Sequence, residues 1–300
     1  MISFFFCQQR LQLKYLTYMN FRSCQYIRKL PDLSIATPNI KELDLCQCGN
    51  LIEVHDFVGR LDKLEKWELN DCIELQVLPN CLLMKSLKHL SLYGCTRLEK
   101  FPNIPQKMEG LKFLSMVMTA ITELPPSFGN LTGLDQLYIG SEFCSGHLPS
   151  SIYKLQNLCG LYLLGNVKFS KDVDIDRQAL CDYGGYDFTS LNFLYLYFSK
   201  NCSKVDFILT SCCPLSLKLL FLRSEDLTLR ESYIRFNRLR RLVIRDSSFL
   251  KEIPNLPESI RRVDASNYFS LNSQSLSKLS LQVSLSLLKL KGNIFGSLPK

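Results

Sequence analysis

The chain has 300 residues, of which 46% are hydrophobic and 21% are charged, a composition typical of a globular protein with a sizeable core. Its formal net charge of +8 lies in residues 217–300, which hold fifteen Lys and Arg against seven Asp and Glu. No stretch approaches the roughly 18 consecutive apolar residues of a membrane-spanning helix. The N-terminal residues lack the flanks of a secretory signal, and thirteen cysteines in a chain of this length indicate a reducing compartment.

The chain is organised as copies of one repeat. Residues 1–15 are expected to form a lead-in that is an incomplete cap, and residues 16–300 a repeat array with an open C-terminal end. Apolar residues follow the start of each copy at positions +3 and +5, as Leu90 and Leu92 follow Leu87. Twelve copies, mostly 21 to 26 residues long, begin at Leu16, Ile40, Leu64, Leu87, Leu111, Leu134, Leu158, Leu191, Leu217, Leu239, Ile260 and Leu285. A period of about 20 to 29 residues with this spacing is the leucine-rich-repeat signature.

This spacing predicts the fold. The residues at +3 and +5 alternate along a short strand, so both point to the same face. Strands of successive copies then add to a parallel sheet, and their inward leucines form one continuous core. We therefore predict an α/β fold, a leucine-rich-repeat solenoid or horseshoe with a parallel concave sheet. Recurrent Leu-Pro pairs are expected to close the convex side, because proline fixes φ and donates no hydrogen bond.

Position +8 carries a small polar side chain in many copies. The chain turns off the strand there, and the backbone groups that it buries need hydrogen-bond partners. A Cys thiol or an Asn amide can be that partner. The expected structural ladder is Cys24, Cys48, Cys72, Cys95, Asn166 and Asn293. One thiol per copy does not bring together the ligands of a zinc site, so we expect no metal and no cofactor.

Several stretches resemble a known family. They include "NIKELDLCQCGNLIEVHDFVGRLDKLEKWELNDC", "LPSSIYKLQNL" and "LPESIRRVDASNYFSLNSQSLSKL". This wording is similar to the leucine-rich-repeat region of plant intracellular disease-resistance proteins of the Toll/interleukin-receptor, nucleotide-binding class. The resemblance implies a cytoplasmic, or also nuclear, sensor in plant defence. Its repeats would detect a pathogen effector or a host protein that the effector alters, and would restrain a nucleotide-binding domain until then.

Parts of that class are not found in this sequence. No G-x-x-x-x-G-K-[ST] loop is present to hold a nucleotide phosphate, and no span resembles a Toll/interleukin-receptor domain. The array starts and stops without evident capping units, which solenoids need to cover their ends. The expectation is a fragment or a truncated gene product.

The outward residues of the strands are the expected recognition surface. At +4 they change from acidic to small to aromatic along the chain, and +6 adds tyrosine and arginine. Exposed tyrosines flanked by arginine are typical of binding hot spots, although cross-strand stacking that only stiffens the sheet is the alternative. The candidate partner-binding residues are Tyr138, Tyr162, Tyr195, Tyr197, Phe221, Arg223 and Arg245.

Two further segments invite other functions. Between Leu158 and Leu191 an insertion within 166–190 holds Asp172, Asp174 and Asp176, but a calcium loop also needs a Gly and a Glu that are missing here. We expect an acidic loop that can take part in recognition. The basic run from Arg230 to Arg245 comes with no nucleic-acid-binding motif, so a solvated face or one that meets an acidic protein is expected.

Catalysis finds no support in the sequence. The three histidines, His55, His89 and His147, lie in different copies, and no H-E-x-x-H or G-x-S-x-G motif is present. His89 is expected on the outward side of a strand. The chain is therefore interpreted as a protein-binding module and not an enzyme.

Two other protein-binding classes stay open. The stretch "CSGHLPSSIYKLQNL" and the sequons at Asn130 and Asn201 fit an extracellular receptor ectodomain. A substrate adaptor for ubiquitin ligation is the other alternative, although nothing like an F-box precedes Leu16.

Overall fold

The computed structural model describes residues 13–30, 32, 37–169, 188–197, 215–224, 236–247, 250, 255–266 and 288–291. The chain divides into two compact units. The first unit is Met1–Asn157 with Val167–Asp174, and the second is Leu158–Asn166 with Ile175–Lys300. Most of the expected lead-in, residues 170–187 of the insertion with its three aspartates, and Asn293 lie outside the described residues.

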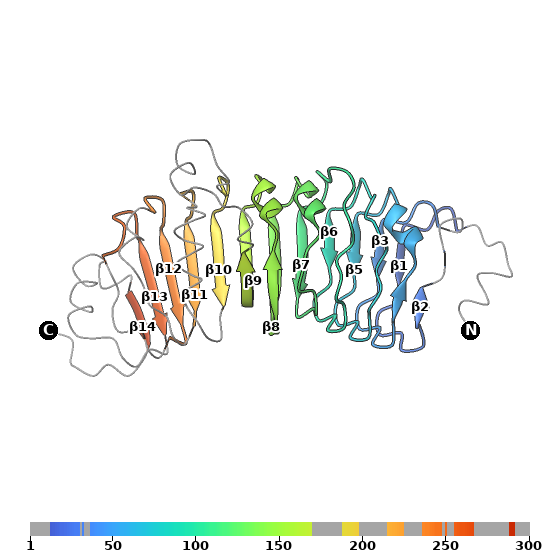
Figure 1. Ribbon diagram of the computed structural model, residues 1–300, viewed down its shortest axis with the longest axis horizontal. Helices are drawn as coiled ribbons and strands as arrows, with labels where there is room; N and C mark the ends of the chain where they lie inside the picture. The colour runs from blue at the N-terminus through green and yellow to red at the C-terminus, as the bar shows by residue number, and fades with distance from the viewer. Residues whose placement is uncertain are drawn as a thin grey trace. The chain divides into compact units, whose positions relative to one another are not determined.

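The first unit is built on six parallel strands (Figure 1), which are β1 (Tyr18–Asn20), β3 (Glu42–Asp44), β5 (Lys66–Glu68), β6 (His89–Ser91), β7 (Phe113–Val117) and β8 (Gln136–Leu148). Each strand pairs with the equivalent residues of the next copy, as Leu43 does with Trp67 and Trp67 with Leu90. These +3 side chains are buried, and so are those at +5 apart from the half-buried Phe21. Because each copy buries its apolar residues only against its neighbours, the stacked copies make one core.

The return segments of this unit contain a second, two-stranded parallel sheet and three short 3₁₀ helices. The small sheet pairs β2 (Lys29–Leu30) with β4 (Glu53–Val54). The helices are η1 (Asp56–Arg60), η2 (Pro126–Asn130) and η3 (Ser150–Lys154), and a proline caps or starts the last two. Successive copies approach closely here: a Cβ on Gly133 would lie 1.9 Å from the Glu109 carbonyl oxygen. The Leu-Pro pairs at 124–125 and 148–149 thus precede these helices on the return side, as expected.

The second unit repeats the same arrangement. Its strands are β9 (Gly160–Phe169, of which Gly160 to Asn166 belong to this unit), β10 (Phe193–Tyr197), β11 (Leu219–Arg223), β12 (Arg241–Arg245), β13 (Arg262–Ser266) and β14 (Leu288–Lys291). Figure 1 shows β10 to β14 side by side, from yellow to red. All neighbouring pairs are parallel, and equivalent positions are in register, as Leu194 is with Leu220.

The turn after each strand has a recurrent backbone conformation. Position +7 has a positive φ in many copies, for example 61° at Ser23, 60° at Gln47 and 59° at Asp71. This left-handed region is unusual for residues other than glycine. The free-energy cost of this left-handed backbone is offset here, because the reversal of the chain turns the side chain at +8 towards the interior.

The predicted fold class is confirmed as a parallel-sheet solenoid of leucine-rich repeats. Each of the twelve expected copies contributes a strand. Counted as turns that include a return segment, the described residues make about eight, somewhat fewer than the twelve repeats predicted. The later return segments largely fall outside the described residues.

Candidate protein-binding face

The outward residues at +4 line up as a column in each unit. In the first unit the strand register joins Asn20, Asp44, Glu68, Ser91, Ser115 and Tyr138. In the second it joins Tyr162, Tyr195, Phe221, Val243, Asp264 and Lys289. The columns follow the copy spacing read from the sequence, because equal spacing from each start places equivalent residues side by side.

The aromatic part of the second column is continuous. The rings of Tyr162 and Tyr195 stack with centroids 4.3 Å apart, and those of Tyr195 and Phe221 lie 5.4 Å apart. All three side chains are half-buried, so one part of each ring stacks on its neighbour while another part remains open to a ligand. Such stacked aromatics combine a large apolar area with low conformational entropy.

Arginines border these rings. The Arg223 guanidinium lies 4.4 Å from the centre of the Tyr197 ring, and its Nε contacts an Asp246 carboxylate oxygen at 2.5 Å. Arg245 is in register with Arg223 on the neighbouring strand and is exposed. The structure therefore brings Tyr162, Tyr195, Tyr197, Phe221, Arg223 and Arg245 together on β9 to β12 of the second unit.

A buried carboxylate anchors the next strands. Asp264 is 8% exposed, and one of its oxygens lies 2.7 Å from Arg241 Nη2 while the other lies 2.9 Å from Arg262 Nε. Burial alone would raise the pKa of Asp264, but the hydrogen bonds and charges of Arg262 and Arg241 outweigh it and lower this pKa below its usual value. The aspartate is thus ionised and holds both arginines on the sheet face.

Tyr138, the remaining candidate, belongs to the first unit. It is half-buried and lies beside Phe113, with ring centroids 5.3 Å apart. The Phe113 ring stacks in turn on His89 at 4.3 Å, and His89 Nε2 lies 3.0 Å from Glu68 Oε1. His89 therefore lies on the outward side of its strand as expected, engaged by neighbours on both sides.

The charged groups around Glu68 are largely paired with one another. Lys66 Nζ lies 3.3 Å from Glu68, and Asn70 donates to the second Glu68 oxygen at 3.1 Å. Burial alone would raise the pKa of Glu68, but the hydrogen bonds and charges of His89 and Lys66 lower it. On the neighbouring strand, Arg22 binds Asp44 at 3.2 Å. On this face of the first unit, most charged side chains are therefore paired with one another.

Apart from His89, the sequence did not single out the outward column at +2. It contains Phe113 in the first unit, in register with His89, and Phe193 and Arg241 in the second, in register with Gly160 and Leu219. Phe193 is 39% exposed and faces Gly160 on the adjacent strand. The position precedes the first strand leucine and lies outside the L-x-L core of the motif, although alternation along the strand places it on the same face as +4.

The +8 side chains of the early copies donate to the preceding copy. The thiols of Cys48, Cys72 and Cys95 lie 3.0, 3.0 and 3.2 Å from the carbonyl oxygens of Phe21, Leu45 and Leu69. All three cysteines are buried, and burial raises the pKa of the Cys95 thiol to about 12. These thiols stay protonated and act as donors. Cys24 is half-buried, and Asn166 is described for its backbone alone.

Later copies use the +8 position differently. The Thr119 hydroxyl donates to the Met116 carbonyl oxygen, and the Ser247 hydroxyl to that of Arg245. Both bonds stay within one copy. The short hydroxyl side chains therefore close their own turn, whereas the cysteines link neighbouring copies.

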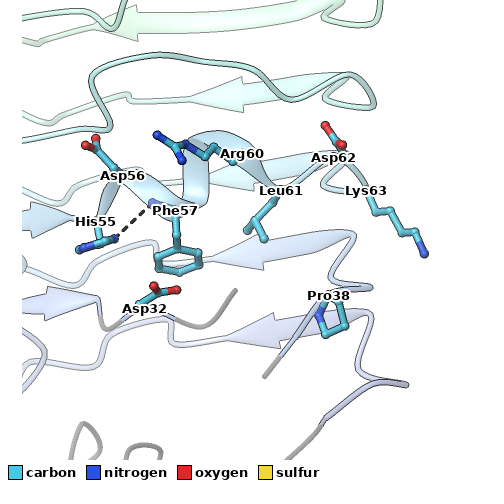
Figure 2. A pocket seen from close by; sticks show the side chains of 9 residues that line it. All are labelled: Asp32, Pro38, His55, Asp56, Phe57, Arg60, Leu61, Asp62 and Lys63. Carbon is cyan, nitrogen blue, oxygen red and sulfur yellow. Dashed lines mark hydrogen bonds between the residues drawn. The ribbon is translucent and has the colours of Figure 1, made fainter. Parts of the chain in front are cut away.

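One pocket lies on the return side of the first unit, around η1. It encloses about 590 Å³ and is lined by Asp32, Pro38, His55, Asp56, Phe57, Arg60, Leu61, Asp62 and Lys63. Figure 2 shows Phe57 and Leu61 pointing towards the segments of Asp32 and Pro38, while Asp56 and Arg60 point away. His55 Nδ1 accepts the Phe57 backbone N–H, and Asp56 accepts from Asn80. The lining of the pocket thus mixes acidic and basic groups. The His55 bond caps η1, and the Asp56 bonds hold Asn80 of the next copy.

Among the described residues, no group of three or more His, Cys, Asp or Glu side chains could hold a metal ion. None of the helices in the same part of the chain is long and apolar enough to cross a membrane.

Comparison with known proteins agrees with this architecture. Residues 82–174 match the family described as disease resistance protein RPS4B-like leucine-rich repeats. The protein SUPPRESSOR OF npr1-1, CONSTITUTIVE 1 of Arabidopsis thaliana is 37% identical over 46% of this chain and 9% of its own length. TMV resistance protein N of Nicotiana glutinosa is 36% identical over 46% of this chain and 12% of its own length.

A third relative aligns over more of the chain. Disease resistance protein RPP5 of Arabidopsis thaliana is 31% identical over 65% of this chain. The chain matches between 9% and 14% of the length of these three relatives. Leucine-rich repeats of this kind are typically non-enzymatic protein-binding modules. The chain is thus a leucine-rich-repeat region related to those of plant disease-resistance proteins, as the sequence resemblance indicated.

Proposed function

We propose that this chain recognises a protein in plant defence, as the sensor region of a cytoplasmic immune receptor. Its partner would be a pathogen effector or a host protein that an effector alters. In the receptor class that it resembles, the same repeats would restrain a nucleotide-binding domain. The relatives named for disease resistance support the setting.

The observation that carries this proposal is the outward face of β9 to β12. Three stacked aromatic rings lie there beside arginines, on a rigid parallel sheet whose other face is core. A rigid face with half-open aromatic rings and arginine is the composition of a protein-binding hot spot. We expect Tyr195, at the centre of the three rings, to contribute most to binding.

The test is a crosslinking pull-down from the cytosol of infected leaves. The baits are the wild-type chain, a Tyr195→Ala variant and a Tyr26→Ala control, whose tyrosine is 98% exposed on a turn outside the strands. We expect one or more specific partners with wild type and Tyr26→Ala, and their loss with Tyr195→Ala, while circular dichroism shows all three baits folded. Recovery of the same partners by all three baits would contradict the proposed face.

A further inference from the structure

The outward face of the second unit has two chemically different parts. The aromatic part consists of Phe193 and Tyr195 on β10 and Phe221 on β11. The arginine part consists of Arg223 on β11, Arg241 and Arg245 on β12, and Arg262 on β13. Because β10, β11 and β12 pair directly and in register, the two parts form one surface.

The aromatic part contains an open ring. Phe193 is 39% exposed, and its register partner on β9 is Gly160, which has no side chain. On the other side its partner is the half-buried Leu219. One edge of the ring therefore has no side chain beside it from the neighbouring strand. An apolar side chain of a partner could bury that edge and so remove apolar surface from water.

The arginine part carries more positive charge than its neighbours neutralise. On the strand positions of this face, four arginines stand against Asp264 alone, with Asp246 just after β12 holding Arg223. Arg241 and Arg262 share Asp264, and their side chains remain 44% and 40% exposed. Arg245 is exposed and makes no ion pair with any described residue. A carboxylate arriving there would meet a guanidinium ready for a charge-assisted hydrogen bond.

We infer that this face binds an extended acidic segment of the partner protein, with an apolar or aromatic residue against Phe193 and a carboxylate at Arg245. This inference rests on the proposed function and specifies the chemistry of the partner. Strands lie about 4.8 Å apart, so two steps from β10 to β12 cover about 10 Å across the sheet. Arg245 lies four residues beyond Arg241, the register position of Phe193 on β12, which adds about 13 Å along the strand. An extended chain advances about 3.3 Å per residue. The two positions are therefore about 16 Å apart, and the apolar residue and the acidic residue are expected about five positions apart in the partner's sequence.

The experiment is a selection of random peptides of about twelve residues, long enough to cross the face when extended, on the full chain. Four proteins are compared: wild type, Tyr195→Ala, Arg245→Glu and an Arg238→Glu control, whose arginine is exposed on the turn before β12. We expect peptides with an apolar and an acidic residue about five positions apart. Their binding should fall about tenfold with Arg245→Glu and stay unchanged with Arg238→Glu, since charge complementarity of this kind contributes around 1.4 kcal/mol. Selection on Arg245→Glu should favour Lys or Arg at the acidic position.

The outcomes separate the two proposals. Peptides that require Tyr195 but show no acidic preference, or bind Arg245→Glu as well as wild type, would overturn the acidic-segment inference and leave the proposed function standing. Selected peptides that bind Tyr195→Ala as well as wild type would overturn both.

Discussion

The two units use the same backbone for different surfaces. The outward positions of β1 to β7 in the first unit carry Lys66 and His89 beside three acidic side chains, and Lys66 and His89 both pair with Glu68. Those of the second unit carry four arginines against one aspartate, beside three stacked aromatic rings. Equal scaffolds with different columns show that the fold places the outward positions, and the side chains there decide the chemistry of each surface.

The interior shows a parallel difference. In the early copies of the first unit, the thiols of Cys48, Cys72 and Cys95 bond to the copy before, whereas Thr119 later in the same unit and Ser247 in the second unit close their own turns. The first unit therefore gains inter-copy hydrogen bonds in its core. Substitutions in each unit test how much these contacts between copies contribute to stability.

The largest effect is expected for Gly133→Ala in the first unit. The new Cβ would lie 1.9 Å from the Glu109 carbonyl oxygen, so the backbone of one copy must move. We expect a loss of about 2–3 kcal/mol in the free energy of unfolding, because overpacking of this kind forces backbone shifts. Chemical denaturation followed by fluorescence measures it, since Trp67 is the sole tryptophan and is fully buried in the first unit.

Gly49→Ala is the matched control for that measurement. Its Cβ would meet the Gln25 side-chain oxygen at 3.0 Å, the end of a flexible chain on an exposed residue. We expect a change within about 0.5 kcal/mol. Equal losses for the two variants would show that the close stacking at Gly133 is not what holds the copies together.

The next effect concerns the thiol ladder. Cys72→Ala removes the donor to the Leu45 carbonyl oxygen and is expected to cost about 1–2 kcal/mol. The Leu45 oxygen retains the Cys48 backbone N–H, which limits the loss. Cys72→Ser keeps a donor of similar size and should cost less than Cys72→Ala. If Ser costs as much as Ala in the same denaturation assay, the thiol serves only to fill space.

A smaller effect is expected for Asp264→Asn in the second unit. The variant removes the charge that holds Arg241 and Arg262, and partial exposure of both arginines limits the cost to about 1 kcal/mol. The folded pKa of Asp264 lies below its ordinary value of 3.8, so this stabilisation is present above that pH and is lost as the pH falls below it. Thermal unfolding across this pH range should show wild type and variant converging in acid. A constant difference would contradict the ionic role of Asp264.

The smallest effect is expected for a return-side ion pair of the first unit. Arg97 Nη1 lies 2.5 Å from Glu74 on the preceding copy, but its side chain is 58% exposed. Arg97→Ala should change the free energy of unfolding by less than about 1 kcal/mol, since solvent screens exposed pairs. A double-mutant cycle with Glu74→Ala would isolate the pair. A coupling above that value would mean that exposed ion pairs, and not the thiol ladder, link the copies.

Much of the fold could be predicted from the sequence because the repeat is regular. The spacing of +3 and +5 residues was enough to place the strands and, through parallel stacking, the columns that contain Tyr195 and Phe221. Three features could not be predicted from this spacing. Phe193 lies at +2, ahead of the motif leucines; Met118 adopts a left-handed φ of 59° although it is not glycine. β8 runs for 13 residues where β1 has three.

The polar contacts of the face depend on three-dimensional register. Asp264 and Arg241 are 23 residues apart, and they meet because the lengths of successive copies put β12 beside β13. One residue more or less in that copy would change which side chains face each other. The sequence alone shows that arginines are frequent here, and only the register shows that Arg245 forms no ion pair with a described residue.

The most direct test of the central claim is hydroxyl-radical footprinting of the chain with and without a partner captured from infected leaves. We predict that binding protects the aromatic side chains of β10 and β11, Phe193, Tyr195 and Phe221, and leaves Phe113 and Tyr93 of the first unit as reactive as before. Protection of Phe113 and Tyr93 with unchanged reactivity at Tyr195 would contradict the claim that the second unit carries the recognition face.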